Sequence, residues 1–402
     1  MPNHPQHSDI RLLDGHWYVQ DPLGAYRWLR ENAPLYYSEL DDIWAASGHE
    51  QVMFVSKNRQ LFCSGNGSRP HTEPERNPAS MINMDDPMHR MRRGLVNKGF
   101  TPRRIEDHEE KVRRLCREIV EKVAPLGRCD FVRDIAAPLP MIMIGDMLGV
   151  APEDRGDLLR WSDDLIAGTT ETASPEIRAR ANRAGQEYGR YIQEVIRDRR
   201  SRPEGDDLIS LLVHAELEGE RLDDEALHHE SLLILVGGDE TTRHVISGGM
   251  EMLIRHPDQR RKLIEDPGRI PVAVEEMLRW VSPIKNMNRT ATRDVEIAGE
   301  KIREGQEVLL LYHSANRDER VFERPGLFDV EREPNDHVAF GGYGAHFCLG
   351  ASLARLELRV MFDTLLELLP DMTLATDDPL PLRPSNFIVG IEEMPVEFTP
   401  RG

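Results

Sequence analysis

The feature that most constrains the fold is one long helical stretch, residues 224–256, whose centre is apolar on every side. Asp223 or Asp224 can cap its start, and Pro257 ends it. At about 1.5 Å per residue, the stretch extends for about 50 Å. The run Leu232–Val236 offers no polar face to solvent, and a helix that is apolar all round is buried. The sequence therefore predicts a protein built around one helix that crosses its centre.

The rest of the chain predicts further helices and a small β portion. Residues 105–124 and the charge-rich residues 178–200 show helical periodicity of their apolar side chains. Strand-like pieces occur in residues 295–311, and residues 351–369 predict a helix that ends before Pro370. Length alone favours two or three domains, but no linker, repeat or low-complexity tract divides the chain. We therefore expect one mainly α domain over residues 1–402.

Charge and composition exclude several classes of function. The chain has 51 Lys and Arg against 70 Asp and Glu, a net charge of −19, which argues against nucleic-acid binding and against anionic membranes. Met1–Arg11 is polar and carries no signal-peptide pattern. No apolar run approaches the roughly 18 residues of a membrane span. Four cysteines without close pairing are typical of a reducing compartment, so we expect a cytoplasmic protein.

A glycine-rich loop, residues 340–350 with the sequence FGGYGAHFCLG, places a single cysteine directly before a predicted helix. Thiolate is a strong ligand for iron, and the start of a helix favours the deprotonated sulfur. Glycines let backbone amides approach the sulfur closely. By itself the pattern is also typical of a buried structural cysteine in a tight turn, so the metal-ligand interpretation depends on the other motifs.

The middle of the long helix contains GGDETT, residues 237–242. Two glycines in a helix interior each cost about 1 kcal/mol relative to alanine, and an acidic pair in an apolar stretch adds a desolvation penalty. Thr241 lies four residues after Gly237, so its hydroxyl can bond that carbonyl and open the helix. A groove beside a metal is one interpretation, and a glycine pair that serves helix packing is the other.

Together these segments resemble the cytochrome P450 superfamily. The loop is similar to the haem-binding pattern F-G-x-G-x-H/R-x-C-x-G at five positions, although Phe340 stands one residue early. The matching residues are Gly342, Gly344, His346, Cys348 and Gly350. Residues 237–242 match the oxygen-activation motif A/G-G-x-D/E-T-T at every position. The resemblance extends over essentially the whole chain and implies a single-domain P450 fold whose long helix crosses a haem b group.

The resemblance implies roles for particular residues. Cys348 is the expected iron ligand, and Glu240 and Thr241 are the expected catalytic pair that supplies protons while dioxygen is activated. The expected contacts of the haem carboxylates are His89, Arg93, Arg289 and His346. Taken singly, each of these residues would by default be interpreted as an ordinary surface or core residue that binds no ligand.

A structural network is implied in the same way. Glu276 and Arg279 match the family's E-x-x-R pair, and Arg332 closes the later segment F-x-x-P-x-x-F-D-x-x-R. Pairs at this spacing usually lie on a helix surface and contribute little. In the family, the three side chains are buried under the haem.

The segment His89–Arg104 holds six Lys and Arg and no acid in a strongly acidic chain. A solvated basic face is one interpretation. The other is a docking surface for an acidic ferredoxin, because complementary charge guides encounter. The resemblance to the soluble bacterial class implies that electrons pass from NAD(P)H through a ferredoxin reductase and ferredoxin to the haem. We expect the protein itself to be a monomer.

Four segments resemble the actinobacterial steroid side-chain oxidases more closely: Cys129–Pro140, Arg160–Leu165, Lys285–Met287 and Leu382–Phe387. Those enzymes hydroxylate a terminal methyl (C26 or C27) of cholesterol or cholest-4-en-3-one and oxidise it further to the acid. The expected apolar pocket residues are Met81, Ile82, Leu235, Val236, Gly237, Ile284, Met287 and Ile388. Flexible methionines suit an elongated apolar ligand, although core packing would explain each residue as well.

Two other functions remain open on the sequence. One is the same hydroxylation chemistry on a polyketide, terpene or fatty acid. The other is a haem protein that binds ligands without turnover, which Glu240 and Thr241 argue against. A peroxide-driven reaction is also disfavoured, because an acid–threonine pair suits reductive activation of dioxygen.

Overall fold

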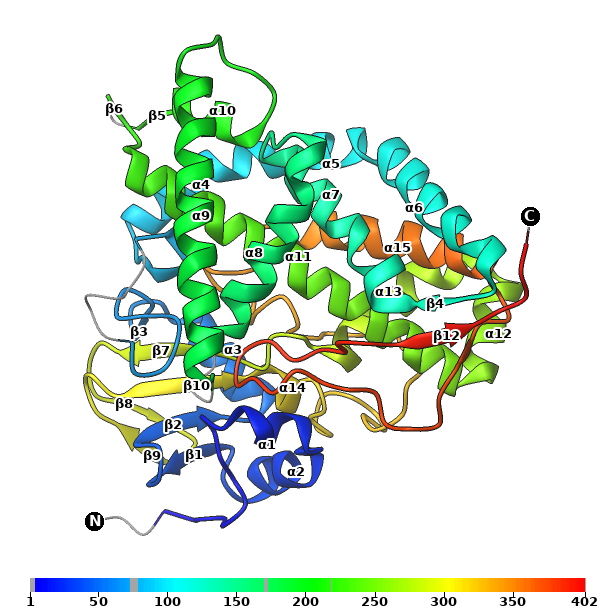
Figure 1. Cartoon of the computed structure of the whole chain (residues 1–402). Coiled ribbons are helices and arrows are strands. Elements are labelled where there is room, and N and C mark those ends of the chain that lie inside the picture. Colours follow the sequence, from blue (N-terminus) through cyan, green and yellow to red (C-terminus); the bar gives the residue numbers. More distant parts are fainter. Residues whose placement is uncertain (1–3, 73–78, 170–172, 218, 402) are drawn as a thin grey trace.

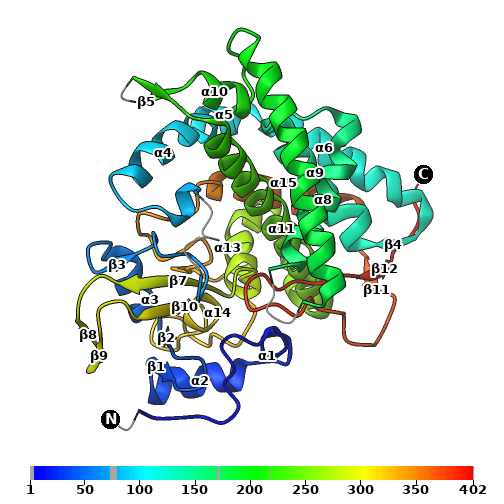
Figure 2. The same cartoon turned by 60° about the vertical axis from the view of Figure 1, so that its left-hand side comes forward.

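The long central helix is present as α11, Asp224–Arg255, in a computed structural model that describes residues 4–72, 79–169, 173–217 and 219–401. The Asp223 side chain caps the helix by accepting a hydrogen bond from the backbone N–H of Ala226 at 2.8 Å. Pro257 begins the next helix, α12 (Pro257–Glu265). In both views α11 runs through the interior and is covered by other helices (Figures 1 and 2). The predicted central helix is therefore confirmed.

Helices cover α11 on several sides and bury its apolar middle. Those that pack directly against it are α7 (Pro138–Met147), α8 (Arg155–Ala167), α9 (Pro175–Arg200), α10 (Leu208–His214), α13 (Ile270–Val281) and α15 (Ala351–Leu368). Outside this layer, α6 (Glu109–Val123) packs on α15 and α7. No helix in the described ranges has both the length and the apolar character that a bilayer crossing needs.

The remaining helices are short and lie toward the sheet or at the ends of the larger ones. They are α1 (Gly15–Val19), α2 (Leu23–Asn32), α3 (His49–Lys57), α4 (Met88–Val96), α5 (Pro102–Asp107) and α14 (Tyr312–Ala315).

The largest sheet has the strand order β1-β2-β10-β7-β3 and lies to one side of the helices (Figure 1). Its strands are β1 (Leu35–Ser38), β2 (Ile43–Ala46), β10 (Glu307–Leu311), β7 (Asn286–Ala291) and β3 (Phe62–Cys63). β10 pairs parallel with β2 and antiparallel with β7. Smaller sheets join β11 (Thr373–Leu374), β12 (Pro395–Glu397) and β4 (Arg128–Asp130), β5 (Glu216–Leu217) with β6 (Glu220–Arg221), and β8 (Val295–Ile297) with β9 (Glu300–Ile302).

Two sequence expectations need correction. Residues 105–124 form two helices rather than one, since α5 ends at Asp107 and α6 begins at Glu109. The backbone N–H of His108 bonds the carbonyl of Ile105 at 3.1 Å, so the chain turns more tightly there than an α-helix does. Strands β1 and β2 also lie outside residues 295–311, the segment for which strands were expected. They are only four residues long and almost wholly buried, so they show no alternation of polar and apolar residues.

A buried charge network holds the segment that leads to the cysteine loop. Arg279 is 0% exposed, and its Nε and Nη2 donate to the two carboxylate oxygens of Glu276 at 2.7 and 2.8 Å. Arg332 donates to Glu276 Oε2 at 3.0 Å. Arg279 also bonds the carbonyl of Asn316 at 2.8 Å, and the Asn316 amide oxygen accepts from the backbone N–H of Val338 at 2.7 Å. The network therefore fixes the chain just before the loop begins.

Glu276→Gln tests this network. The substitution leaves two buried guanidinium groups without their counter-charge, which costs about 3–5 kcal/mol in comparable sites. We expect a loss of that size in the free energy of unfolding in urea. The matched control is Glu331→Gln, whose partners Lys262 and Arg269 are exposed, with an expected change below about 1 kcal/mol. Equal effects of the two substitutions would contradict the structural role.

Candidate active site

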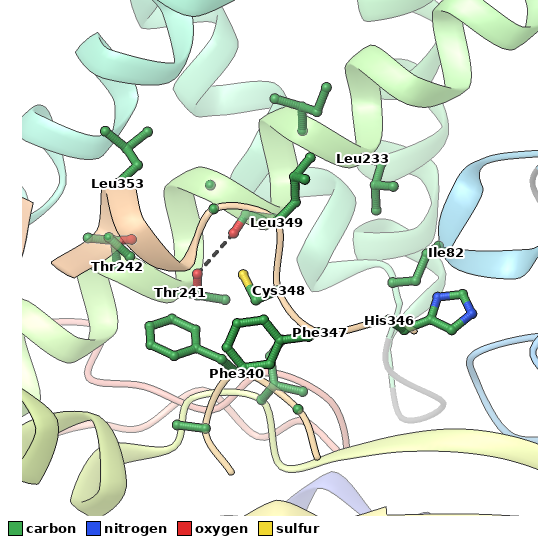
Figure 3. Close-up of a pocket in the computed structure, with 18 of the residues that line it drawn as sticks. Ile82, Leu233, Thr241, Thr242, Phe340, His346, Phe347, Cys348, Leu349 and Leu353 are labelled. Carbon is green, nitrogen blue, oxygen red and sulfur yellow. Dashed lines mark hydrogen bonds between the residues drawn. The ribbon is translucent and has the colours of Figure 1, made fainter. Parts of the chain in front are cut away.

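A cavity lies between the middle of α11 and the loop that carries Cys348 (Figure 3). Gly237 and Thr241 line it from α11, and Phe340 and Phe347 line it from the loop. The helix and the loop are about a hundred residues apart in the sequence. The fold therefore brings the two motifs singled out in the sequence to opposite sides of one space.

Cys348 faces this cavity at the point where α15 begins. Its thiol is exposed to the cavity, and the backbone N–H groups of Gly350 and Ala351 donate to the sulfur. Burial nevertheless raises the pKa of the Cys348 thiol, against the effect of those amides and of Arg93. A bound metal cation would supply the positive charge that stabilises a thiolate here. The residue therefore has the exposure and the donors of an iron ligand.

The loop glycines have a packing role that the sequence did not indicate. A Cβ on Gly344 would lie 1.9 Å from the carbonyl oxygen of Ser56 in α3, and one on Gly342 would lie 2.3 Å from its hydroxyl. The loop is thus pressed onto α3. Phe340, although one residue early for the family pattern, still lines the cavity, with its ring centroid 6.2 Å from that of Phe347.

Four basic side chains gather on one side of the cavity: His89, Arg93, Arg289 and His346. The rings of His89 and His346 lie 4.1 Å apart between centroids. Burial and the neighbouring Arg289 lower the pKa of His346 to about 2, and burial lowers the pKa of Arg93 and of Arg289. His346 is therefore neutral, and the two guanidinium groups carry positive charge in a place that disfavours it.

The two arginines of this cluster have no acidic partner among the described residues, whereas His89 Nδ1 lies 3.7 Å from Asp86 Oδ1. Arg93 donates to the Phe347 carbonyl at 2.5 Å and Arg289 to the Asn288 carbonyl at 2.6 Å, and neither forms an ion pair within the described residues. The buried Nε2 of His89 has no hydrogen-bond partner there either. Two buried carboxylates on a ligand would supply the missing charge and acceptors. The residues present therefore fit a haem whose carboxylates face this cluster and whose iron faces Cys348.

The two adjacent glycines of α11, Gly237 and Gly238, have different surroundings. A Cβ on Gly238 would lie 2.3 Å from Cδ1 of Ile144 in α7, whereas a Cβ on Gly237 meets nothing within 4 Å. Gly238 therefore allows close helix packing and Gly237 leaves space beside the cavity. The hydroxyl of Thr241 donates to the Gly237 carbonyl at 2.9 Å (dashed in Figure 3). This bond is the one expected from the four-residue spacing.

Glu240, which also belongs to α11, is buried and is not among the described residues that line the cavity. Its carboxylate accepts hydrogen bonds from Arg243, from His244 at 3.1 Å and from Arg383 at 3.1 Å. Although burial opposes ionisation, these three basic groups hold the pKa of Glu240 well below its usual value. Thr241 and Glu240 are adjacent in sequence but face different surroundings, so a proton path between them needs water or movement.

Two site residues were missed by sequence reasoning. Arg383, in the C-terminal segment, reaches Glu240 and also bonds Glu392 at 3.1 Å. Glu357 lines the cavity from α15 and is 2% exposed, and burial together with the nearby Asp239 raises its pKa to about 8. An acid on the buried face of a helix, between Leu356 and Leu358, was the available signal for Glu357.

The expected pocket residues separate into two groups. Met81, Ile82, Gly237, Ile284 and Met287 line the cavity. Leu235, Val236 and Ile388 are not among the described residues that line it; Leu235 is 0% exposed in the core, and Ile388 pairs with Ile284 in an isolated bridge.

Leu233 and Ile234 line the cavity instead of Leu235 and Val236. The lining residues of α11 recur every four positions, at 233/234, 237/238 and 241/242, as one helix face requires. Because the helix is apolar all round, its sequence could not indicate which face this is.

The basic stretch His89–Arg104 is not one continuous surface. His89 and Arg92 are buried, and Arg93 lines the cavity. Arg90, Lys98 and Arg103 are exposed, and Arg104 donates to the Asp206 carbonyl at 3.0 Å. Fewer side chains are therefore available for a protein partner than the sequence suggested.

A cysteine at the start of a buried helix, two buried arginines without an ion pair among the described residues and a central helix that borders the cavity at Gly237 and Thr241 are the features of a haem-thiolate protein. The family model for cytochrome P450 matches residues 40–394. The chain therefore belongs to the cytochrome P450 family; it is a P450 monooxygenase, and its cofactor is haem. The alternative function, a haem protein that binds ligands without turnover, is therefore not supported.

Several known proteins are similar to this chain over nearly its whole length. A steroid C26-monooxygenase of Mycolicibacterium smegmatis is 48% identical over 98% of this chain and 96% of its own length. A methyl-branched lipid omega-hydroxylase of Mycobacterium bovis is 37% identical over 98% and 95%. Among solved structures, a Mycobacterium marinum cytochrome P450 in complex with pseudoionone has a TM-score of 0.91 and 34% identity over 99% of this chain and 100% of that one.

Gly344→Ala tests the fit between the cysteine loop and α3. The added methyl must displace backbone rather than a flexible side chain, so overpacking costs about 1–3 kcal/mol and moves the loop. We expect lower thermal stability and a clearly reduced ratio of bound haem to protein. Gly326→Ala is the matched control, since a Cβ there meets nothing within 4 Å. Full haem content in the Gly344→Ala protein would contradict this account of the loop.

Proposed function

We propose that this chain hydroxylates a terminal methyl group of the side chain of cholesterol or cholest-4-en-3-one and oxidises it further toward the acid. In the first step one oxygen atom of O₂ enters the C–H bond and the other leaves as water, with two electrons and two protons consumed. Repetition at the same carbon gives the aldehyde and then the acid.

The observation that carries the proposal is the apolar wall of the cavity. Away from the basic cluster and Glu357, the side chains that line it are uncharged and mostly aliphatic, methionine or aromatic, among them Met81, Ile82, Leu233, Ile284 and Met287. No charged group in that wall would hold a carboxylate or a sugar. A steroid nucleus and tail match such a surface, and the relative named as a steroid C26-monooxygenase supports this choice of substrate class.

The wall must also select the carbon that reacts. A terminal methyl is harder to attack than the tertiary carbon beside it, so the selectivity has to come from positioning. Haem held by Cys348 supplies the activation of dioxygen when bound. Gly237 leaves space beside the cavity and Thr241 presents a hydroxyl there, so this part of α11 can hold dioxygen and a water molecule next to the substrate tail.

Proton supply is the task we assign to Thr241 and Glu240. The hydroxyl of Thr241 accepts and donates at the cavity surface, and the ionised Glu240 is a proton acceptor in contact with Arg383. Arg383 also bonds Glu392, whose side chain is 43% exposed. A change in the Arg383 contacts would join Glu240 to solvent on that side, and water would carry the proton from Glu240 to Thr241.

For electron supply we propose NAD(P)H, a ferredoxin reductase and a ferredoxin. The exposed Arg90, Lys98 and Arg103 would form the docking surface, since they lie on the segments next to the basic cluster of the cavity. An acidic partner would be attracted to this patch despite the acidic chain. We further propose that the protein acts as a cytoplasmic monomer of one domain over residues 1–402.

A second candidate substrate is a methyl-branched fatty acid or related lipid, oxidised at its terminal methyl. The relative named as a methyl-branched lipid omega-hydroxylase favours it over a polyketide or terpene. The same apolar wall would accept such a chain. It would however leave a carboxylate near the mouth, for which the wall offers no cation.

Titration of the ferric protein with cholest-4-en-3-one tests the proposed substrate. We expect a saturable blue shift of the Soret band, because a steroid in the cavity would displace water from the iron. Product analysis with reductase and ferredoxin then identifies the carbon attacked. A Soret band that does not move with steroids but shifts with branched fatty acids would replace the steroid proposal by the second candidate.

Thr241→Ala tests the proton role. We expect product formation to fall by about 100-fold or more while NAD(P)H oxidation continues, so that reducing equivalents are lost to other products. Thr241→Ser keeps the hydroxyl and should retain most of the coupling. Normal coupling in the alanine variant would contradict the assigned role.

A further inference from the structure

Glu230 is a buried acid of α11 that the proposed reaction does not use. It lies seven residues before Gly237 and is 0% exposed. One carboxylate oxygen, Oε1, accepts two hydrogen bonds: from the backbone N–H of Met81 at 2.8 Å and from Nη1 of Arg92 at 3.2 Å. A single atom therefore joins three segments that are far apart in the sequence.

Each of these segments contributes to the cavity. Met81 and Ile82 line it from the short 3₁₀ helix η2 (Met81–Asn83). Arg92 belongs to α4, where the next residue, Arg93, lines the basic side of the cavity. Glu230 lies one turn before Leu233 and Ile234 on α11, which also line it. The carboxylate thus lies at the junction of the apolar wall, the basic cluster and the central helix.

The wall segment has separate anchors at its two ends. Beyond Met81, the Asn83 amide oxygen accepts from the N–H of Ser68 at 3.0 Å, and Asp85 accepts from the N–H groups of Ser64 and Gly65 at 2.8 and 2.9 Å. These bonds tie the far end of the segment to the chain that follows β3. Glu230 ties the near end, at Met81, to α11.

Stability alone is a poor explanation for this acid. A buried ion pair usually contributes no more than apolar residues of the same size would, unless all its hydrogen bonds are made. Glu230 Oε2 and Arg92 Nε have no hydrogen-bond partner among the described residues. Burial also raises the pKa of Glu230 to about 7, against the effect of Arg92. What the carboxylate does provide is a fixed position for the Met81 backbone, which an apolar side chain could not supply.

We infer that Glu230 is a positioning residue that holds the Met81–Ile82 wall against α11 and thereby determines how tightly, and with which carbon toward the iron, an elongated apolar ligand is bound. The choice of a steroid as that ligand rests on the proposed function, whereas the positioning of the wall does not. Arg92 accordingly serves the cavity and does not belong to a docking surface.

Hydrogen exchange of the holoenzyme tests the positioning directly, because the amide of Met81 is itself the donor. In Glu230→Leu we expect that amide to exchange about fivefold faster or more, with the rest of α11 unchanged. Glu230→Gln keeps an acceptor and should retain most of the protection, which also guards against a leucine variant that does not fold. Glu225→Gln, an exposed acid on the same helix, is the matched control. Unchanged protection of Met81 in both Glu230 variants would overturn the inference.

Binding of imidazoles to the haem iron tests, without any steroid, whether the Met81–Ile82 wall affects the affinity for an elongated apolar ligand. Imidazole is too small to reach the wall, whereas an imidazole with a long apolar substituent must lie against it. We expect Glu230→Leu to weaken the long ligand about fivefold or more and imidazole by less than twofold, at unchanged haem content. Equal weakening of both ligands, or of neither, would overturn the inference.

The steroid reaction then separates this inference from the proposed function. If the wild type converts cholest-4-en-3-one, Glu230→Leu should raise KM more than it lowers kcat and should yield products at carbons other than the terminal methyl. If the wild type does not respond to steroids, the proposed substrate is wrong, while hydrogen exchange and the pair of imidazoles still decide the role of Glu230.

Discussion

A helix that is apolar on all sides has to be covered on all sides, and the structure is arranged around that need. α11 spans the molecule within a layer of other helices, and its middle borders the cavity at Gly237 and Thr241, where the Thr241 hydroxyl bonds the Gly237 carbonyl. Gly238, one position further, is pressed onto Ile144. The same helix therefore supplies core packing and one wall of the site, and adjacent residues serve the two tasks. The cavity exists because the cover around α11 is incomplete at this point.

Buried charge performs different tasks in different parts of the molecule. At Glu276, Arg279 and Arg332 the acid and bases are matched and hydrogen-bonded, and the network fixes backbone carbonyls before the cysteine loop. Around Arg93 and Arg289 the bases are unmatched among the described residues, which is costly in an apolar setting. A prosthetic group with two carboxylates removes that cost. Haem binding would therefore also stabilise the fold here, since its carboxylates would neutralise charges that the described residues leave unpaired.

The sequence predicted the parts of this arrangement that depend on local pattern. A helix apolar all round, the spacing of Thr241 to Gly237 and the position of Cys348 before a helix are all properties of neighbouring residues, and α11, its cap and α15 appear where they were expected. The sequence could not predict which side of a helix or segment each side chain would face. Leu235 and Leu233 look alike in the sequence, yet only Leu233 lines the cavity. Arg92 and Arg103 belong to one basic run, yet one is buried against Glu230 and the other is exposed. Such differences come from tertiary packing, which assigns residues to faces.

Glu230 and Glu240 are ten residues apart on α11, and each binds a segment from elsewhere in the chain. Glu230 holds the backbone of Met81, and Glu240 is held by Arg383 in the C-terminal segment. Neither attachment requires a change in the helix itself, so the segments that meet it can vary while the residues facing the iron stay in place. Relatives that share this helix but differ in those segments would then differ in the shape of the cavity rather than in the chemistry. Such a separation would let one fold serve different substrates, and proteins similar to this chain are named as a steroid C26-monooxygenase and as a methyl-branched lipid omega-hydroxylase.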